Sequence, residues 1–271
     1  MIELLRDMFS YGFMTRALVV GTLVSLCAAL LGVTLVLKRY SLIGDGLSHV
    51  GFGALSIALA MNLAPLQVAI PVVVLAAFLL LRITEKSRIK ADAAIALIST
   101  AALAAGVIVT SLSTGMNIDV YNYMFGSILA MSESDVYLSI ALSAVVLVLF
   151  LALYPKIFAV TFDEAFARAT GMNAGFYNLI IAVLTAVTIV VGMRIMGTML
   201  ISSLIIFPAL TSMRVFSRFR AVVISSAIVS VVCFGVGIML SCLYSLPAGA
   251  GIVAVNLVAF LIFSLAGALR A

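Results

Sequence analysis

Long stretches without a charged residue are the feature that most limits what this chain can fold into. Five of them, each free of Asp, Glu, Lys and Arg, cover residues 17–37, 93–118, 136–155, 195–213 and 221–269. About 20 apolar residues are enough for an α-helix to cross the hydrocarbon core of a membrane. The last stretch is long enough for two crossings around the turn-rich residues 245–251, and residues 46–81 hold two more, divided near Pro65.

The composition agrees with an integral membrane protein. Only 9% of the residues are charged, 65% are hydrophobic and the mean hydropathy is +1.36, whereas soluble domains are about a quarter charged. No strand-like alternation of apolar and polar residues is found, and lipid otherwise permits only helices to span. We therefore predict an all-α integral membrane protein, a polytopic bundle of eight or nine transmembrane helices forming one domain over residues 1–271.

The distribution of charge predicts how this bundle is oriented. Basic residues cluster at Lys38–Arg39, Arg82–Lys90, Lys156 with Arg168, and Arg214–Arg220. The acids Asp119, Glu133 and Asp135 share a different loop that lacks Lys and Arg. The positive-inside rule places the basic clusters in the cytoplasm and the acidic loop outside. The net charge is +5, and the basic residues orient the protein by their distribution, so they require no nucleic-acid partner. Residues 1–13 are expected to lie on the membrane lipid as an amphipathic segment.

One polar pair lies within the apolar sequence. His49 is the only histidine, and Asp45 is the only acid between Asp7 and Glu85. A spacing of four residues puts both side chains on one face of a helix. Such a pair in a hydrocarbon setting is typical of a divalent metal site or a proton site. The alternative is a structural role, with Asp45 paired to Lys38–Arg39 and His49 bonded to a neighbouring helix.

A metal site built on this pair requires a second copy of the chain. One carboxylate and one imidazole are too few ligands, because Zn²⁺ takes about four and Mn²⁺ about six. Two copies of the helix meeting at a twofold axis would supply two carboxylates and two imidazoles. The residues alone leave the metal and structural interpretations open.

The longest polar segment lies on the predicted cytoplasmic side and begins at Phe162. Thr161 or Asp163 is placed to cap a short helix, and Gly171 to end it. Phe162 and Phe166 are one turn apart, so they would share a face with nothing of the chain's own to bury it. This pattern predicts either a helix that docks a partner or one that lies in the lipid headgroups.

Two features near the outer surface favour ordinary structural roles. Arg194 follows a long apolar run near the predicted outer end of its helix. We interpret it as an interfacial or structural arginine rather than a gating one, since a long side chain reaches the membrane surface. The acids of the outer loop are interpreted as solvated charges in preference to a docking site for a partner.

Several blocks of sequence together resemble one family. Gly44-Asp45-Gly46-Leu47-Ser48-His49, after Leu37-Lys38-Arg39-Tyr40-Ser41, resembles the signature R-x-S-hydrophobic-hydrophobic-G-D-A-L-S-H of zinc, manganese and iron ABC importer permeases. Residues 123–129, 162–171 and 191–211 are similar to further elements of that family, in the same order along nearly the whole chain. Two departures, Gly46 in place of alanine and the lack of glycine at residues 94–96, touch none of the expected chemistry.

The resemblance implies an assembly as well as a fold. The fold would be that of the vitamin B12-type (type II) importer permeases, working as a homodimer. The partners would be two cytoplasmic ABC ATPase subunits and an extracytoplasmic metal-binding solute-binding protein. Asp45 and His49 match the positions that contact the metal. Within the coupling segment 155–176, the implied ATPase-coupling residues are Phe162, Asp163, Glu164, Ala165, Phe166 and Gly171.

The implied function is that of an ATP-driven import permease in the cytoplasmic membrane of a bacterium, with Zn²⁺ first as its cargo and Mn²⁺ or Fe²⁺ next. The sequence has no Gly-x-x-x-x-Gly-Lys-Ser/Thr phosphate loop. We therefore expect the chain not to be an enzyme and to hold no permanent cofactor, with ATP hydrolysed by its partner. The alternatives are a siderophore or cobalamin permease of similar architecture and a proton-coupled secondary metal carrier.

Overall fold

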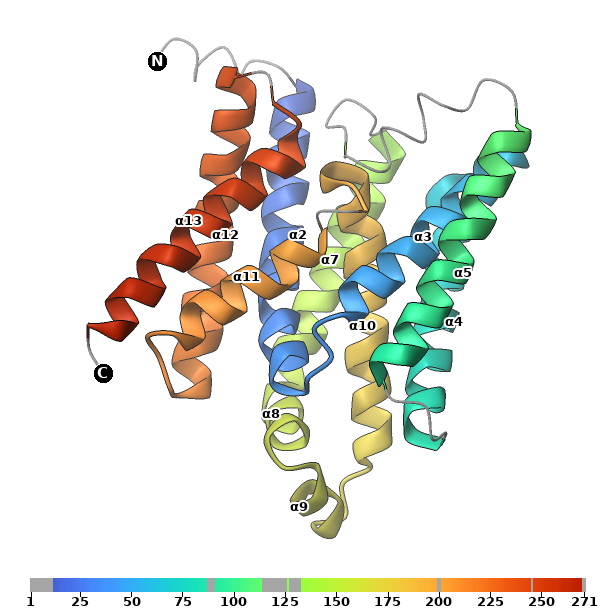
Figure 1. Cartoon of the computed structure of the whole chain (residues 1–271). Coiled ribbons are helices and arrows are strands. Elements are labelled where there is room, and N and C mark those ends of the chain that lie inside the picture. Colours follow the sequence, from blue (N-terminus) through green and yellow to red (C-terminus); the bar gives the residue numbers. More distant parts are fainter. Residues whose placement is uncertain are drawn as a thin grey trace.

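The computed structural model describes residues 12–86, 91–113, 126, 133–198, 201–244 and 246–269, and its regular elements there are all helices (Figure 1). The helices are α2 (Gly12–Leu37), α3 (Ile43–Ala60), α4 (Pro65–Lys86), α5 (Ala91–Leu112), α7 (Glu133–Ala152), α8 (Tyr154–Phe162), α9 (Glu164–Ala169), α10 (Ala174–Met196), α11 (Ile201–Met213), α12 (Phe219–Tyr244) and α13 (Ala248–Ala268). Three features of the sequence analysis fall largely outside the described residues: the predicted surface segment 1–13 except residues 12 and 13, the acid Asp119, and the block 123–129 except residue 126.

Eight helices of the described chain are long and apolar enough to cross a membrane, and a ninth, α11, has 13 residues. The prediction of eight or nine spans is confirmed, and α11 accounts for the uncertainty in the number. The charge-free stretch 195–213 is divided because α10 ends at Gly197, whose φ is 85°. A left-handed backbone of this kind terminates a helix, so only the second part of the stretch forms α11.

Two helices organise the bundle. α2 packs against α7, α10, α11 and α12, while α3 packs against α4, α5, α10 and α11. Small residues allow this close packing in lipid: a Cβ added to Gly53 of α3 would lie 2.6 Å from the carbonyl oxygen of Ala102 in α5. Most of α2 and α3 is buried within the protein, whereas most of α5, α7 and α13 faces outward.

The two ends of the bundle carry different charges. α8 and α9 project from one end together with the turn after α2 and the turn between α11 and α12 (Figure 1). This end holds Lys38, Lys156, Arg168 and Arg214–Arg220, so the positive-inside rule makes it cytoplasmic. The beginnings of α2 and α7 lie at the opposite, outer end. The orientation predicted from charge is therefore consistent with the fold.

Three helices end in the same way, with a residue of left-handed backbone just beyond the last turn. These residues are Arg39 after α2, Asn62 after α3 and Gly171 after α9, with φ of 61°, 54° and 86°. The N–H that follows each one donates to a carbonyl five residues back, which satisfies backbone groups at the helix end. The bonds are Tyr40 to Leu35 (2.8 Å), Leu63 to Ala58 (2.9 Å) and Met172 to Ala167 (3.0 Å). Gly171 ends its helix as predicted.

We expect Gly171→Ala to destabilise the end of α9 by about 1–2 kcal/mol, because a side chain in left-handed backbone strains the chain. An added Cβ meets nothing within 4 Å at Gly171, nor at Gly235 in the middle of α12. Gly235→Ala is therefore the matched control, and its helical backbone favours alanine. Hydrogen exchange followed by mass spectrometry should show faster exchange at residues 164–172 in Gly171→Ala alone. Unchanged exchange there would contradict the left-handed assignment.

Candidate metal site and coupling segment

The sequence-predicted pair lies in the first two turns of α3. His49 Nε2 is 3.6 Å from Asp45 Oδ2, and both side chains point from the same helix face. The Asp45 side chain is 51% exposed and the His49 side chain 18% exposed. The predicted register is therefore confirmed, and the carboxylate lies on a surface that one chain leaves open.

The neighbours of α3 explain which strip of the helix the pair occupies. A Cβ on Gly44 would meet Ile205 of α11, and a Cβ on Gly46 would meet Ile95 of α5. Asp45 lies between these two glycines in sequence, so the helical rotation of about 100° per residue directs its side chain between the two contacts. The histidine follows one turn later on the same strip. The pair thus faces the gap between α5 and α11.

Nearby polar groups are already bonded to other atoms. Lys38 Nζ donates to Glu164 Oε2 and to the carbonyl of Val160, both at 3.1 Å. Ser48 Oγ donates to the backbone carbonyl of Asp45 at 2.8 Å, so its hydroxyl points away from the Asp45 carboxylate. Among the described residues, His49 is the ionisable side chain that lies within 4 Å of the Asp45 carboxylate, whereas Lys38 pairs with Glu164. The structural alternative in which Asp45 pairs with Lys38 does not fit this geometry.

The donor set fits a divalent cation. Two donor atoms 3.6 Å apart can both bind one ion at about 2.1 Å, and carboxylate with imidazole suits Mn²⁺, Fe²⁺ or Zn²⁺. His49 Nδ1 is buried and has no hydrogen-bond partner among the described residues. No group of three or more His, Cys, Asp or Glu side chains that could hold a metal is found in the described part of the chain. One chain therefore supplies two donors here, fewer than the roughly four to six ligands that these ions take.

The predicted coupling segment contains two helices, α8 and α9, of which α9 is the short helix that the sequence predicts. Asp163 is extended, with φ −146° and ψ 90°, and separates α8 from α9. Its Oδ1 accepts the N–H of Phe166 at 2.8 Å, so Asp163 caps α9 as predicted. Thr161 instead donates to the carbonyl of Ile157 within α8. Phe166 is 65% exposed beyond this break.

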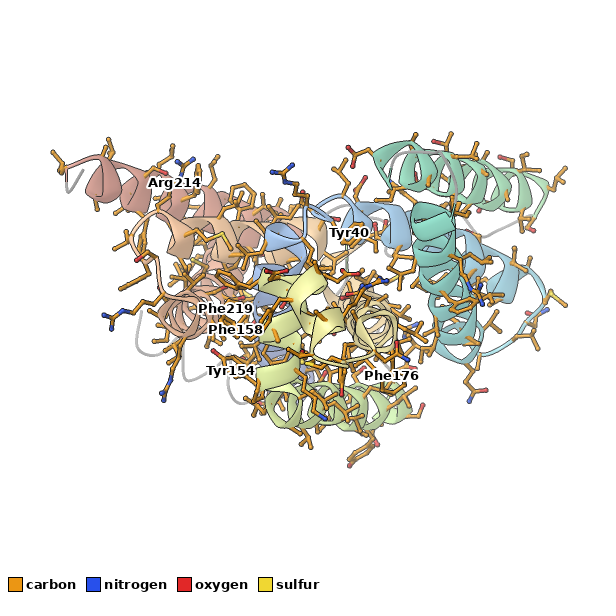
Figure 2. All side chains as sticks on the ribbon, turned by 90° about the horizontal axis from the view of Figure 1, so that it is seen from below. Tyr40, Tyr154, Phe158, Phe176, Arg214 and Phe219 are labelled. Carbon is orange, nitrogen blue, oxygen red and sulfur yellow. The ribbon has the colours of Figure 1, made fainter. Side chains whose placement is uncertain are left out.

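Phe162 and Phe166 lie on different helices. The prediction that nothing of the chain buries these rings is wrong only in part for Phe162, which contacts other rings but is still 60% exposed. Its ring centroid is 4.9 Å from that of Phe158 and 6.0 Å from that of Phe219. Figure 2, seen from the cytoplasmic end, shows Tyr154, Phe158 and Phe219 close together where α8 meets the start of α12, with Phe176 apart from them. Aromatic packing thus anchors α8 to the bundle and leaves Phe166 outward.

The Glu164 carboxylate joins three elements at the cytoplasmic end. Its Oε2 accepts from Lys38 after α2 at 3.1 Å and from Asn178 of α10 at 3.2 Å, and its Oε1 accepts from Arg168 at 2.7 Å. Burial acts to raise the pKa of this carboxyl, but the hydrogen bonds from Arg168, Asn178 and Lys38 outweigh it and lower the pKa to about 2. Because its pKa is lowered, the Glu164 carboxylate stabilises the folded state fully at pH values above its ordinary pKa of 4.5. This stabilisation is lost as the pH falls toward about 2.

Sequence reasoning missed Lys38 and Asn178 as members of this cluster. Lys38 was interpreted as part of a cytoplasmic basic cluster and as a candidate partner of Asp45. The sequence did indicate that Asn178 needs a partner, because an amide four residues after the start of a strongly apolar helix must find a hydrogen-bond partner. The prediction of a partner for Asn178 needs the fold, since Glu164 belongs to another helix.

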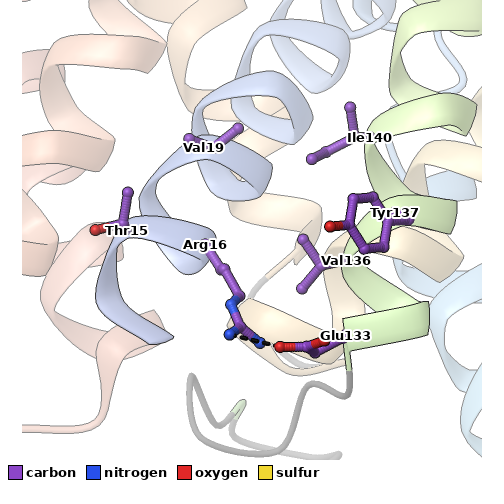
Figure 3. A pocket seen from close by; sticks show the side chains of 7 residues that line it. All are labelled: Thr15, Arg16, Val19, Glu133, Val136, Tyr137 and Ile140. Carbon is purple, nitrogen blue, oxygen red and sulfur yellow. Dashed lines mark ion pairs between the residues drawn. The ribbon is translucent and has the colours of Figure 1, made fainter. Parts of the chain in front are cut away.

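Two ion pairs of different burial lie at the outer end. Arg194 of α10 binds Asp135 of α7, with 6% and 19% of the side chains exposed. Arg16 of α2 binds Glu133 of α7 at 2.7 Å, with 43% and 72% exposed, beside a cavity of about 250 Å³ (Figure 3). The structural interpretation of Arg194 agrees with this geometry. The interpretation of the acids as solvated loop charges is wrong for Asp135, which is largely buried.

Comparison with known proteins identifies the family. The model of the ABC 3 transport family matches residues 10–267. The chain belongs to the ABC 3 transport family. A curated relative from Haemophilus influenzae, named "Probable iron transport system membrane protein", is 31% identical over 97% of this chain and 93% of its own length. The manganese transport system membrane protein MntC of Halalkalibacterium halodurans is 27% identical over 96% of this chain and 88% of its own length.

The fold of this ABC 3 family member also matches a solved structure. PsaBC from Streptococcus pneumoniae, determined in complex with Fab, has a chain that superposes with a TM-score of 0.87 and 28% identity, covering 97% of this chain and 95% of that one. The match confirms the predicted all-α, type II-like permease fold. Eight apolar helices and bacterial membrane relatives confirm the prediction of a multi-pass protein of the bacterial cytoplasmic membrane.

We expect Arg194→Met to lower the free energy of unfolding by about 3 kcal/mol, because the buried Asp135 carboxylate would lose its charged partner. Arg16→Met is the matched control at the same end, where an exposed ion pair contributes at most about 1 kcal/mol. Thermal unfolding of the purified protein in detergent should give a clearly lower midpoint for Arg194→Met. Equal midpoints for the two variants would show that the buried Arg194–Asp135 pair contributes no more to stability than the exposed Arg16–Glu133 pair.

Proposed function

We propose that this chain is the permease subunit of an ATP-driven importer that moves a divalent first-row transition metal ion into a bacterial cell. The observation that carries the proposal is the Asp45–His49 pair, 3.6 Å apart and open to the gap between α5 and α11. Membership of the ABC 3 transport family supplies the class of transporter.

Manganese is the proposed first cargo, with iron next. The sequence analysis favoured zinc, and carboxylate and imidazole ligands suit all three ions. The named relatives are manganese and iron transport system proteins, which supports moving zinc to third place. Selection among the three ions would rest largely with the solute-binding protein, because affinity order alone does not separate them.

A homodimer would complete the site. Two copies meeting across the open strip of α3 would bring together two Asp45 carboxylates and two His49 imidazoles. The half-exposed Asp45 and the buried, unpartnered Nδ1 of His49 support this arrangement. Four ligands of mixed type with few supporting hydrogen bonds suit an ion that stays briefly and moves on, since supporting bonds are what make a metal site tight.

The other proposed partners attach at the two ends of the bundle. Two cytoplasmic ATPase subunits would bind the end at which α9 exposes Phe166, and a metal-loaded solute-binding protein would bind the outer end. ATP binding would bring the ATPase subunits together and move α9, the dimer would open outward, and the ion would pass the Asp45–His49 pair. The segment 155–176 is thus the proposed coupling segment, with Phe162, Asp163, Glu164, Ala165, Phe166 and Gly171 in it.

The Asp45–His49 pair is expected to be needed for metal uptake. We expect Asp45→Asn and His49→Gln to reduce metal accumulation at least about tenfold, because each removes a ligand from a sparse site. Total cellular Mn, Fe and Zn would be measured by mass spectrometry in an uptake-deficient strain that carries the complete transport system at matched membrane levels. The control Ser48→Ala removes a hydroxyl that bonds only to the helix backbone, and it should transport normally.

The same measurement separates the alternatives. Native uptake of one metal with loss in both pair variants supports importer and site together. Native-level uptake in His49→Gln would remove His49 from the pathway while leaving the transport function. Uptake that persists without the ATPase subunits and collapses when the proton gradient is dissipated would instead indicate a proton-coupled carrier.

Phe166 is expected to be a main anchor for the ATPase subunit. Phe166→Ser should reduce co-purification of the ATPase subunit with the permease about tenfold or more, because exposed aromatic side chains dominate binding energy at interfaces. Phe216→Ser, at another exposed phenylalanine of the cytoplasmic end (39% exposed), is the control. Equal recovery of the ATPase subunit with both variants would place the docking surface elsewhere.

A further inference from the structure

Lys38 is a buried charge at the point where α2 ends. Its side chain is only 9% exposed, although lysine is normally solvated. Its Nζ donates to the carbonyl of Val160 in the last turn of α8 and to Glu164 Oε2 in the first turn of α9. Lys38 therefore holds both sides of the α8–α9 break, and burial of a charge requires that these partners stay in place.

The Glu164 carboxylate links α9 to the turn after α2 and to α10, so a movement of α9 acts on both. Glu164 Oε2 is shared between Lys38 and Asn178 of α10, and Asn178 is 8% exposed. Lys38 and Asn178 also line, with Tyr40 and Ile43, a space of only about 10 Å³, which is scarcely the room that one water needs. A displacement of α9 therefore acts on the turn that joins α2 to α3.

The turn between Lys38 and α3 is short and internally bonded. Tyr40 N–H donates to the carbonyl of Leu35 at 2.8 Å, and Ile43 N–H donates to the carbonyl of Tyr40 at 3.0 Å. α3 begins at Ile43, and Asp45 lies in its first turn. The turn is only five residues long, and these two hydrogen bonds join it to the last turn of α2 and to the first residue of α3, so a displacement of Lys38 acts close to the start of α3.

We propose that Lys38 is the positioning residue through which movement of α9 reaches the Asp45–His49 pair. This inference rests on the proposed function, and it adds a path within one subunit from the ATPase-facing helix to the metal ligands. Lys38 touches neither the ion nor the ATPase subunit in this path. It acts through Glu164 on one side and through the turn 38–42 on the other.

The test uses the complete transporter, with its ATPase subunits, reconstituted in lipid vesicles with metal-loaded solute-binding protein. Radioactive Mn²⁺ uptake and ATP hydrolysis are measured on the same vesicles and expressed as ions moved per ATP. We expect Lys38→Met and Glu164→Gln to hydrolyse ATP but to move about tenfold fewer ions per ATP, the size of a typical coupling between two sites. Arg82→Met, a charge loss at the cytoplasmic end of α4, should leave the ratio unchanged.

Two further variants distinguish coupling from a merely structural role. Lys38→Arg keeps the charge, and it should move nearly as many ions per ATP as the native transporter. The double variant Lys38→Met/Glu164→Gln should lose much less than the product of the two single losses, because each change removes the same Lys38–Glu164 ion pair. Unchanged ions per ATP in Lys38→Met, or additive losses in the double variant, would overturn the inference. If Lys38→Met does not assemble, Glu164→Gln and Lys38→Arg decide the question by the same ratio.

Failure of the inference is distinguishable from failure of the proposed function. A native transporter that moves no Mn²⁺, Fe²⁺ or Zn²⁺ in these vesicles would contradict the function itself. A native transporter that moves one of these ions, with Lys38→Met as efficient per ATP, would contradict only the role of Lys38.

Discussion

Hydrocarbon offers no partner to a backbone amide or carbonyl, and this constraint arranges the rest of the molecule. Each span closes its own hydrogen bonds, and buried hydroxyls such as those of Thr185 and Thr188 donate to carbonyls one turn back in the same helix. Polar side chains that do not bond within their own helix in this way therefore indicate a contact or a function. The Asp45 carboxylate lies 3.6 Å from the His49 imidazole, and the pair remains open on one side, which is why the proposed function rests on it.

Packing of α3 decides where that open side lies. Glycines at 44, 46 and 53 let α11 and α5 approach α3 closely on two faces. The face of α3 that carries Asp45 and His49 lies between these two contacts and stays uncovered. A larger residue at these positions would push the neighbours away and widen the strip. The small residues thus shape the opening through which a second subunit would meet the pair, and they carry none of the chemistry themselves.

Features with local causes could be predicted from the sequence, and features with distant causes could not. The spans follow from charge-free stretches, and the Asp163 cap and the Gly171 helix end follow from the chemistry of neighbouring residues. The sequence left the start of α9 open between Thr161 and Asp163, and it did not separate Phe162, in α8, from Phe166, in α9. The contacts of Phe162 with Phe219 and of Lys38 with Glu164 were missed because these partners come from segments far along the chain.

The shortness of α11 has a consequence for how the protein meets membranes of different thickness. A helix of 13 residues is about 20 Å long, so its depth cannot be set by matching the bilayer. Contacts with α2, α12 and α13 set it instead. Thinning or thickening of the lipid would then be taken up by tilting of the outward helices α5, α7 and α13. The inner helices α2, α3 and α11 would then keep their packing on one another, while the position of α5 beside the Asp45–His49 pair would depend on the thickness of the membrane.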